Sequence, residues 1–222
     1  NDGDKAVLLQ RIFRQAQKIK GTPVPFCRAT TQLEFERAWG LGTSSSLIVL
    51  IAKWFQIDAF ELFKNTLTGS GYDIAAAQSD KAVLYNMLPQ MHFSQVKLPE
   101  VFQDSFFLYL GQKQNSEKEV IAFKDRVITD SQISEINHIT SQLQQVKELK
   151  EVEDLIHQHE LLLSAILERE PVKKVFFADY PGAIKSLGAW GGDFIWATRK
   201  TYKDYFIKKG YQTIFDWNDM IL

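Results

Sequence analysis

The chain has 222 residues, which suits one large domain or two small ones, and its 45% hydrophobic residues can form a sizeable core. Its 26 lysine and arginine residues balance 27 aspartate and glutamate residues, and this near-neutral charge argues against a broad nucleic-acid-binding surface. A single cysteine, Cys27, excludes an intramolecular disulfide framework, and no apolar stretch reaches the roughly 20 residues that span a bilayer, so we expect a reducing, cytoplasmic location.

The first part of the chain is predicted to contain one helix and one strand. Residues 4–20 have an apolar face with the 3.6-residue spacing of a helix. Residues 27–35 alternate apolar and polar side chains from Cys27 to Phe35, which is typical of a half-buried strand. The sequence therefore predicts that a strand leads into the glycine-rich turn that follows.

The segment WGLGTSSSLIVLIAKW, residues 39–54, places two glycines and four hydroxyl residues directly before a predicted helix. The apolar residues at helical spacing are Leu47, Leu50, Ile51 and Trp54. A hydroxyl among residues 43–45 could cap the first turn, but a cap leaves Gly40 and Gly42 unexplained. Close glycines let backbone N–H groups approach a ligand, and a helix N-terminus attracts anions. A phosphate-binding loop and a simple cap therefore both remain open.

The next segment is predicted to hold two short helices and two strands. Asp58 is expected to cap the first helix. TGSGYDIAAAQSD, residues 68–80, combines a glycine turn with a run of small residues that favours a helix. The strands at 82–85 and 92–98 follow, with Pro89 in the turn between them.

The remaining residues indicate a second arrangement of strands and helices. The predicted elements are a strand at 106–110, helices capped at Asn115 or Ser116, opened by Asp130 and spanning 151–169, a strand around Ile184, a strand at 194–198, a helix at 201–209 and a strand at 213–217. With the helices of the first crossover taken together, the order β-α-β-β-α-β is that of a ferredoxin-like split βαβ unit with extra helices. A domain boundary is expected near residues 100–104.

Three glycine-rich segments, residues 40–46, 69–73 and 188–192, occur in an order that resembles the GHMP small-molecule kinases. GLGTSSS is similar to the phosphate loop of that family, and GSGYDIAAA is similar to its segment with the active-site aspartate. KSLGAWGGDF resembles the third motif of the family. The Gly-Tyr-Asp-Ile-Ala form resembles a bacterial, mevalonate-kinase-like subgroup.

The resemblance implies an α+β, two-domain GHMP kinase fold. Residues 1–103 would form an incomplete nucleotide- and phosphate-binding domain of the ribosomal protein S5 domain 2-like type. Residues 104–222 would form a ferredoxin-like domain with extra helices. The implied activity is ATP-dependent phosphoryl transfer to a hydroxyl or phosphate of a small metabolite, with ATP and Mg²⁺ as cofactors. Specificity in this superfamily depends on side chains in both domains, so the motifs do not identify the acceptor.

The resemblance also assigns roles to individual residues. It implies that Asp73 is the catalytic aspartate, with a cap of the helix after Gly71 as the alternative. Ser44 and Glu61 are implied as magnesium ligands; Ser44 could equally be a plain cap, and Glu61 lies in an ordinary amphipathic helix, one position from the family spacing. The residues implied in nucleotide binding are Gly40, Leu41, Gly42, Thr43, Ser44, Ser45, Gly191 and Gly192.

Two departures from the family keep other functions open. Trp190 replaces a usual glycine, and no segment matches the Gly-Lys…Gly-Glu motif whose lysine pairs with the catalytic aspartate. We therefore expect the first domain to lack several strands and to expose a sheet edge that could pair with a second copy of the chain. The alternatives are an inactive kinase fragment, a degenerate ligand-binding protein, or an RNA-binding module, which the charge disfavours. Neither a nucleic-acid nor a membrane partner is expected.

Overall fold

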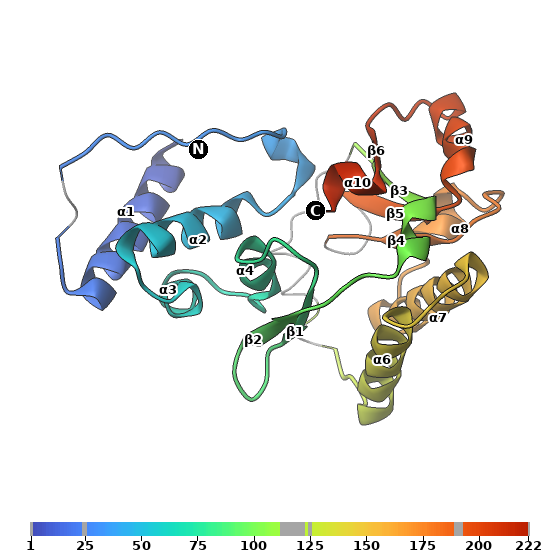
Figure 1. The fold of residues 1–222 in the computed structure, drawn as a ribbon, viewed down its shortest axis with the longest axis horizontal. Helices are drawn as coiled ribbons and strands as arrows, with labels where there is room; N and C mark the ends of the chain where they lie inside the picture. Colours follow the sequence, from blue (N-terminus) through green and yellow to red (C-terminus); the bar gives the residue numbers. More distant parts are fainter. Residues whose placement is uncertain (1, 24–25, 112–122, 124–125, 189–192, 222) are drawn as a thin grey trace. The chain divides into compact units, whose positions relative to one another are not determined.

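The elements fall into two units along the chain (Figure 1). A computed structural model describes residues 2–23, 26–111, 123, 126–188 and 193–221. Unit 1 contains Asn1–Arg37 and Leu41–Val96, and unit 2 contains Ala38–Gly40 and Lys97–Leu222. The chain therefore leaves unit 1 for three residues, returns to it, and leaves it again after Val96.

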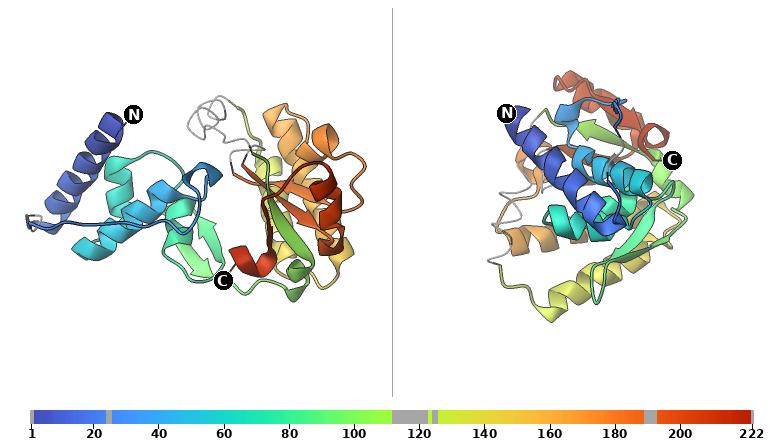
Figure 2. Two further views of the ribbon diagram at one scale, coloured as in Figure 1. Left: turned by 90° about the horizontal axis from the view of Figure 1, so that it is seen from above. Right: turned by 90° about the vertical axis from the view of Figure 1, so that its left-hand side faces the viewer.

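Unit 1 consists of helices and one β-hairpin. Its elements are α1 (Asp2–Lys20), α2 (Thr43–Phe55), α3 (Ala59–Thr66), α4 (Tyr72–Ala77), β1 (Val83–Asn86) and β2 (His92–Gln95). The 3-10 turn η1 (Arg37–Trp39) precedes α2, and its last two residues belong to unit 2. Helix α1 packs against α2 and α3, α4 packs against α2, and β1 pairs with β2 in antiparallel register (Figure 2). The cap predicted for α3 is confirmed, because Asp58 Oδ1 accepts a hydrogen bond of 2.7 Å from the Glu61 N–H.

The buried face of helix α2 matches the predicted one only in part, because Ile51 is buried and Leu47 packs against the core. Its buried residues are Ile48, Val49, Ile51, Ala52 and Phe55. Leu50 and Trp54, which were predicted to face the core, are 55% and 42% exposed. Six consecutive apolar residues, 47–52, occupy every side of the helix, so the spacing does not define which side α1 and α3 cover.

The strand predicted at residues 27–35 is wrong. This segment forms neither helix nor strand, and residues 27–34 are exposed. Among the strands that the structure describes, none pairs with the segment. Alternating side chains stabilise a strand only where a neighbouring strand takes up its backbone hydrogen bonds and one face is buried.

Unit 2 is built on a four-stranded antiparallel sheet. Its elements are η2 (Glu100–Asp104), β3 (Ser105–Tyr109), α6 (Asp130–Leu143), α7 (Leu149–Leu167), α8 (Val172–Phe176), β4 (Ile184–Ser186), β5 (Phe194–Thr198), η3 (Lys200–Tyr202), α9 (Lys203–Lys208), β6 (Ile214–Asp216) and α10 (Trp217–Met220). The strand order is β4-β5-β3-β6, with every neighbouring pair antiparallel. This is the order of a split βαβ unit, as predicted. The helix cap predicted at Asn115 or Ser116 lies outside the described residues.

The central strands of the sheet are buried on both faces. On one face Phe106 and Ile195 pack with Phe177, Tyr180 and Phe206. On the other face lies an aromatic group formed by Phe102, Phe107, Trp196 and Trp217. Two covered faces explain why FFLYL and FIWAT read as continuous apolar runs rather than as alternating patterns. None of the helices that the structure describes is long and apolar enough to cross a membrane.

Candidate functional site

The first glycine turn ends in unit 1 at the N-terminus of α2. Gly42 is the N-cap residue and has a left-handed φ of 72°, which favours glycine. No side chain caps the helix; instead Ser46 donates through both its backbone N–H and its Oγ to the Gly42 carbonyl, at 3.0 and 3.1 Å. The simple hydroxyl cap is therefore wrong, and the first N–H groups of α2 have no side-chain acceptor in the described residues.

The surroundings of this turn leave room for a ligand. A Cβ added to Gly42 would meet no atom within 4 Å. Ser44 is exposed, while Leu41, Thr43 and Ser45 are half-buried. Uncapped N–H groups, three hydroxyl groups and the positive end of a 13-residue helix together suit a phosphate.

The second glycine turn starts α4. Gly71, with a φ of 84°, is its N-cap residue, so Asp73 in the first turn is not the helix cap. A Cβ on Gly71 would lie 3.0 Å from Met91 Sδ and 3.1 Å from the Tyr85 hydroxyl. Tyr85 also donates a hydrogen bond to the Ser70 carbonyl. The β1–β2 hairpin therefore lies close to this turn, and the positive φ together with these close neighbours favours glycine at position 71.

Asp73 is an exposed residue whose carboxyl nevertheless has a raised pKa. Desolvation by the surrounding protein raises the pKa of its carboxyl above the ordinary aspartate value, and a hydrogen bond from Tyr72 partly opposes this rise in pKa. Among the ion pairs of the described residues, none involves Asp73. Because α4 packs against α2, the Asp73 helix and the Gly42-capped helix share one core.

Tyr85 was not predicted from the sequence, where nothing distinguishes it from other strand tyrosines. We expect Tyr85→Phe to lower the free energy of unfolding by about 1 kcal/mol, the usual net value of one hydrogen bond. If the turn positions Asp73, turnover should fall several-fold while nucleotide affinity is unchanged. Tyr205→Phe, which removes a hydroxyl that donates to Asp179 in unit 2 away from the glycine turns, is the matched control for urea unfolding and kinetics.

Glu61 lies on the exposed first turn of α3. In the described part of the chain, no hydrogen bond or ion pair links its carboxylate to Ser44 or Asp73. Across all the residues that the structure describes, no group of three or more histidine, cysteine, aspartate or glutamate side chains could hold a metal. Any Mg²⁺ at this site would therefore depend on ligand phosphates together with one or two protein oxygens.

Gly40 and Gly42 have different surroundings, because Gly40 lies close to Asp193 of unit 2. It belongs to unit 2, has a φ of 73°, and an added Cβ would lie 2.9 Å from Asp193 Cγ. A Cβ on Gly188, with a φ of 72°, would lie 2.7 Å from Asp193 Oδ2. The Asp193 carboxyl is buried, at 5% exposure, so it brings the first and third glycine segments together. Gly191 and Gly192 lie outside the described residues.

Trp39 fixes the approach to Gly40 within unit 2. Its ring lies 5.1 Å from that of Phe215, 6.3 Å from that of Phe194 and 6.4 Å from that of Tyr109, between ring centroids. The Tyr109 hydroxyl donates a hydrogen bond of 3.2 Å to the Ala38 carbonyl. Aromatic packing therefore positions the start of the glycine turn, a role that the sequence pattern did not reveal.

Two solved structures are similar to this fold. The Lin0012 protein from Listeria innocua aligns with a TM-score of 0.66 and 15% identity, over 91% of this chain and 76% of that chain. The L. major mevalonate kinase, in complex with R-mevalonate, aligns with a TM-score of 0.61 and 16% identity, over 96% of this chain and 77% of that chain. No family model matches the sequence, and no curated protein matches it significantly. The chain therefore has a mixed α/β fold, with antiparallel sheets, that is similar to the fold of the L. major mevalonate kinase.

Proposed function

We propose that this protein is an ATP-dependent small-molecule kinase that transfers a phosphoryl group to a hydroxyl or phosphate of a metabolite. The observation that carries the proposal is the N-terminus of α2, which Gly42 opens and no side chain caps. It occurs on a fold similar to that of a mevalonate kinase. Phosphoryl transfer requires mainly positioning and charge stabilisation, both of which oriented backbone donors supply.

In this proposal each residue of the first two glycine turns, together with Glu61, has a separate role. Backbone N–H groups and hydroxyls of Thr43, Ser44 and Ser45 bind the nucleotide phosphates, and Gly40, Leu41 and Gly42 shape the turn. Asp73 orients the acceptor hydroxyl or takes its proton. Ser44 would hold Mg²⁺ through its exposed hydroxyl, with Glu61 as a second oxygen donor. Bound there, Mg²⁺ would neutralise negative charge on the nucleotide phosphates.

Nucleotide binding can be tested directly on this protein. We expect ADP with Mg²⁺ to shift backbone amide NMR signals of residues 42–45, because those N–H groups would donate to the phosphates. Ser44→Ala should reduce the dependence of ADP affinity on Mg²⁺, whereas Ser94→Ala, an exposed serine on β2, should not. ADP binding that leaves residues 42–45 unshifted would contradict the loop assignment, and unchanged Mg²⁺ dependence would remove Ser44 from its role.

A second candidate function is ligand binding without turnover. It is favoured by the absence of a lysine or arginine partner for Asp73 among the described residues, since a paired cation helps to keep a catalytic carboxylate ionised. A kinase assay against mevalonate, phosphomevalonate and sugar acceptors separates the two candidates. Nucleotide binding at residues 42–45 without phosphoryl transfer to any of these acceptors would favour the second.

A further inference from the structure

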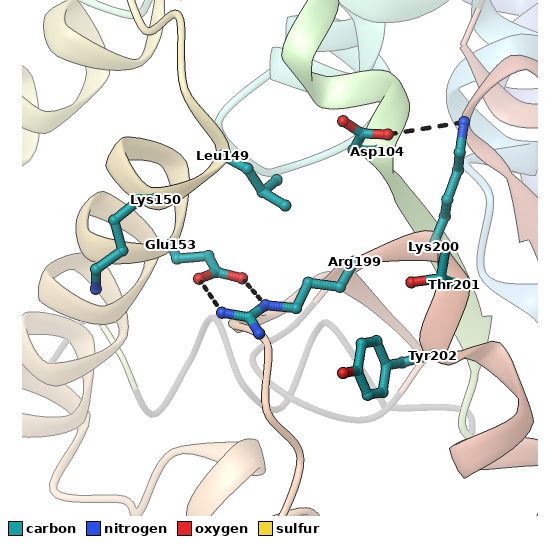
Figure 3. A pocket seen from close by; sticks show the side chains of 8 residues that line it. All are labelled: Asp104, Leu149, Lys150, Glu153, Arg199, Lys200, Thr201 and Tyr202. Atoms are coloured by element: carbon teal, nitrogen blue, oxygen red, sulfur yellow. Dashed lines mark hydrogen bonds and ion pairs between the residues drawn. The ribbon is translucent and has the colours of Figure 1, made fainter.

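Unit 2 contains a cavity that plays no part in the proposed kinase site (Figure 3). Its volume is about 340 Å³, within the range of small-molecule sites. Its lining residues come from η2, the first turns of α7, and η3: Asp104, Leu149, Lys150, Glu153, Arg199, Lys200, Thr201 and Tyr202. The cavity lies past the end of β5, whereas Gly188 and Asp193 precede its start. A five-residue strand separates the two ends by about 16 Å.

Arg199 is fixed in place at the centre of this cavity. Its Nε and one Nη donate to the two oxygens of Glu153, at 2.7 and 2.9 Å (Figure 3). Glu153 is buried and also accepts a bond of 2.9 Å from Thr198 Oγ1, so the guanidinium cannot rotate freely. The backbone of Arg199 has a φ of 63°, a conformation that costs a non-glycine residue about 1–3 kcal/mol and that clusters at ligand sites.

Part of the hydrogen-bonding capacity of Arg199 is unused. A guanidinium carries five N–H donors, and Glu153 takes one from Nε and one from a single Nη. In the described residues, no acceptor contacts the other Nη, and none is bonded to the Thr201 or Tyr202 hydroxyls. All three of these residues line the cavity.

Lys200 adds a second cation that can move to a ligand. Its Nζ lies 3.7 Å from Asp104 Oδ1, and the two side chains are 49% and 56% exposed. Ion pairs this exposed contribute roughly 0–1 kcal/mol, so an anion in the cavity can compete for Lys200. Lys150 is also on the cavity wall, although it pairs with Asp154 at 2.5 Å.

We propose that this cavity binds a phosphomonoester of a small organic molecule. A phosphate offers several oxygen acceptors in different directions, which match a fixed arginine, a movable lysine and two hydroxyls. The cavity is larger than a phosphate ion, and Leu149 and the Tyr202 ring provide apolar surface for the organic part. This site is independent of the proposed kinase function, because none of its residues lies in the glycine turns.

The test uses NMR titration of the whole chain with glycerol 3-phosphate, inorganic phosphate and glycerol. Glycerol 3-phosphate should shift the amide signals of residues 199–202 more strongly than inorganic phosphate, and glycerol should not shift them. Lys200→Gln should weaken the affinity for glycerol 3-phosphate about tenfold, the effect of one charged hydrogen bond. Lys208→Gln, an exposed lysine of α9 outside the cavity, should change it less than twofold.

Four results would overturn the proposal: equally tight binding of inorganic phosphate and glycerol 3-phosphate, no shift at residues 199–202 with millimolar glycerol 3-phosphate, shifts confined to residues 42–45, or equal weakening by Lys200→Gln and Lys208→Gln. The last would show attraction by overall charge rather than a site. Inorganic phosphate binding as tightly as glycerol 3-phosphate would identify a free-phosphate site and contradict the role of Leu149 and Tyr202. Lys200 lies on the surface, so Lys200→Gln is expected to fold; a matching thermal unfolding midpoint would confirm this.

Discussion

Replacing Asp73 with asparagine is expected to lower turnover about 10²- to 10⁴-fold, the usual contribution of a general base. Asparagine keeps the shape of the side chain but can neither take a proton nor carry the charge. Nucleotide affinity should change little, because the proposed phosphate donors belong to α2. Steady-state kinetics and ADP titration of the same variant measure both quantities, and normal turnover in Asp73→Asn would eliminate the catalytic assignment.

The raised pKa of Asp73 also predicts how activity and stability depend on pH. As a base, Asp73 must be ionised, so activity should fall as pH drops through its pKa, at a higher pH than for an ordinary aspartate. The folded state also holds this proton more tightly than the unfolded state, so ionising Asp73 costs stability as pH rises through its folded pKa. Asp73→Asn should therefore be at least as stable as the parent protein at neutral pH. A large loss of stability would instead indicate a structural role.

Gly40→Ala is expected mainly to reduce the stability of the protein, whereas Gly42→Ala is expected mainly to weaken ADP binding. Gly40 and Gly42 have nearly equal φ values, 73° and 72°, so alanine at either position carries a similar left-handed penalty of about 1–2 kcal/mol. At Gly40 the new methyl also meets the buried Asp193 carboxyl at 2.9 Å, whereas at Gly42 it meets no protein atom. Overpacking typically adds about 1–3 kcal/mol, so Gly40→Ala should lower the free energy of unfolding more than Gly42→Ala.

The loss of ADP affinity should be larger for Gly42→Ala than for Gly40→Ala. If the open space at Gly42 holds nucleotide phosphates, its methyl occupies that space, and Gly42→Ala should weaken ADP binding at least tenfold. Urea unfolding and ADP titration measure the two effects separately. In an Asp193→Ala background, Gly40→Ala should cost no more than Gly42→Ala, because the crowding is removed. Equal stability losses in the parent background would contradict the close contact with Asp193.

The sequence predicts those features of the fold that depend on local chemistry or on long patterns. The antiparallel β3–β5 core follows from two continuous apolar runs, and the α3 cap follows from Asp58. The strand at 27–35 was wrong because its stability depends on a pairing partner, which alternation alone does not supply. The predicted buried face of α2 was right for Leu47 and Ile51 and wrong for Leu50 and Trp54, because the apolar run surrounds the helix and the packing partners decide its orientation.

In the candidate site, too, locally determined features are predictable from the sequence and long-range contacts are not. Glycines at 42 and 71 are predictable because helix starts with left-handed caps require them. Tyr85, Met91 and Asp193 were missed as neighbours of these turns, since their contacts arise from residues 14 to 153 positions away along the chain. The glycine motif marks where a backbone approaches something closely. It does not say whether the close neighbour is a ligand, as proposed at Gly42, or a protein side chain, as at Gly40 and Gly71.

Because Ala38–Gly40 belong to unit 2, the two units cannot be separated by a single truncation after Val96. Trp39 packs against the rings of Phe194, Phe215 and Tyr109, although it precedes Lys97, where unit 2 resumes, by more than fifty residues. A shortened chain that starts at Lys97 would retain every strand of the sheet and still expose those three aromatic rings to water. Such a piece would tend to self-associate, and a peptide supplied in trans that carries Trp39 would restore its solubility.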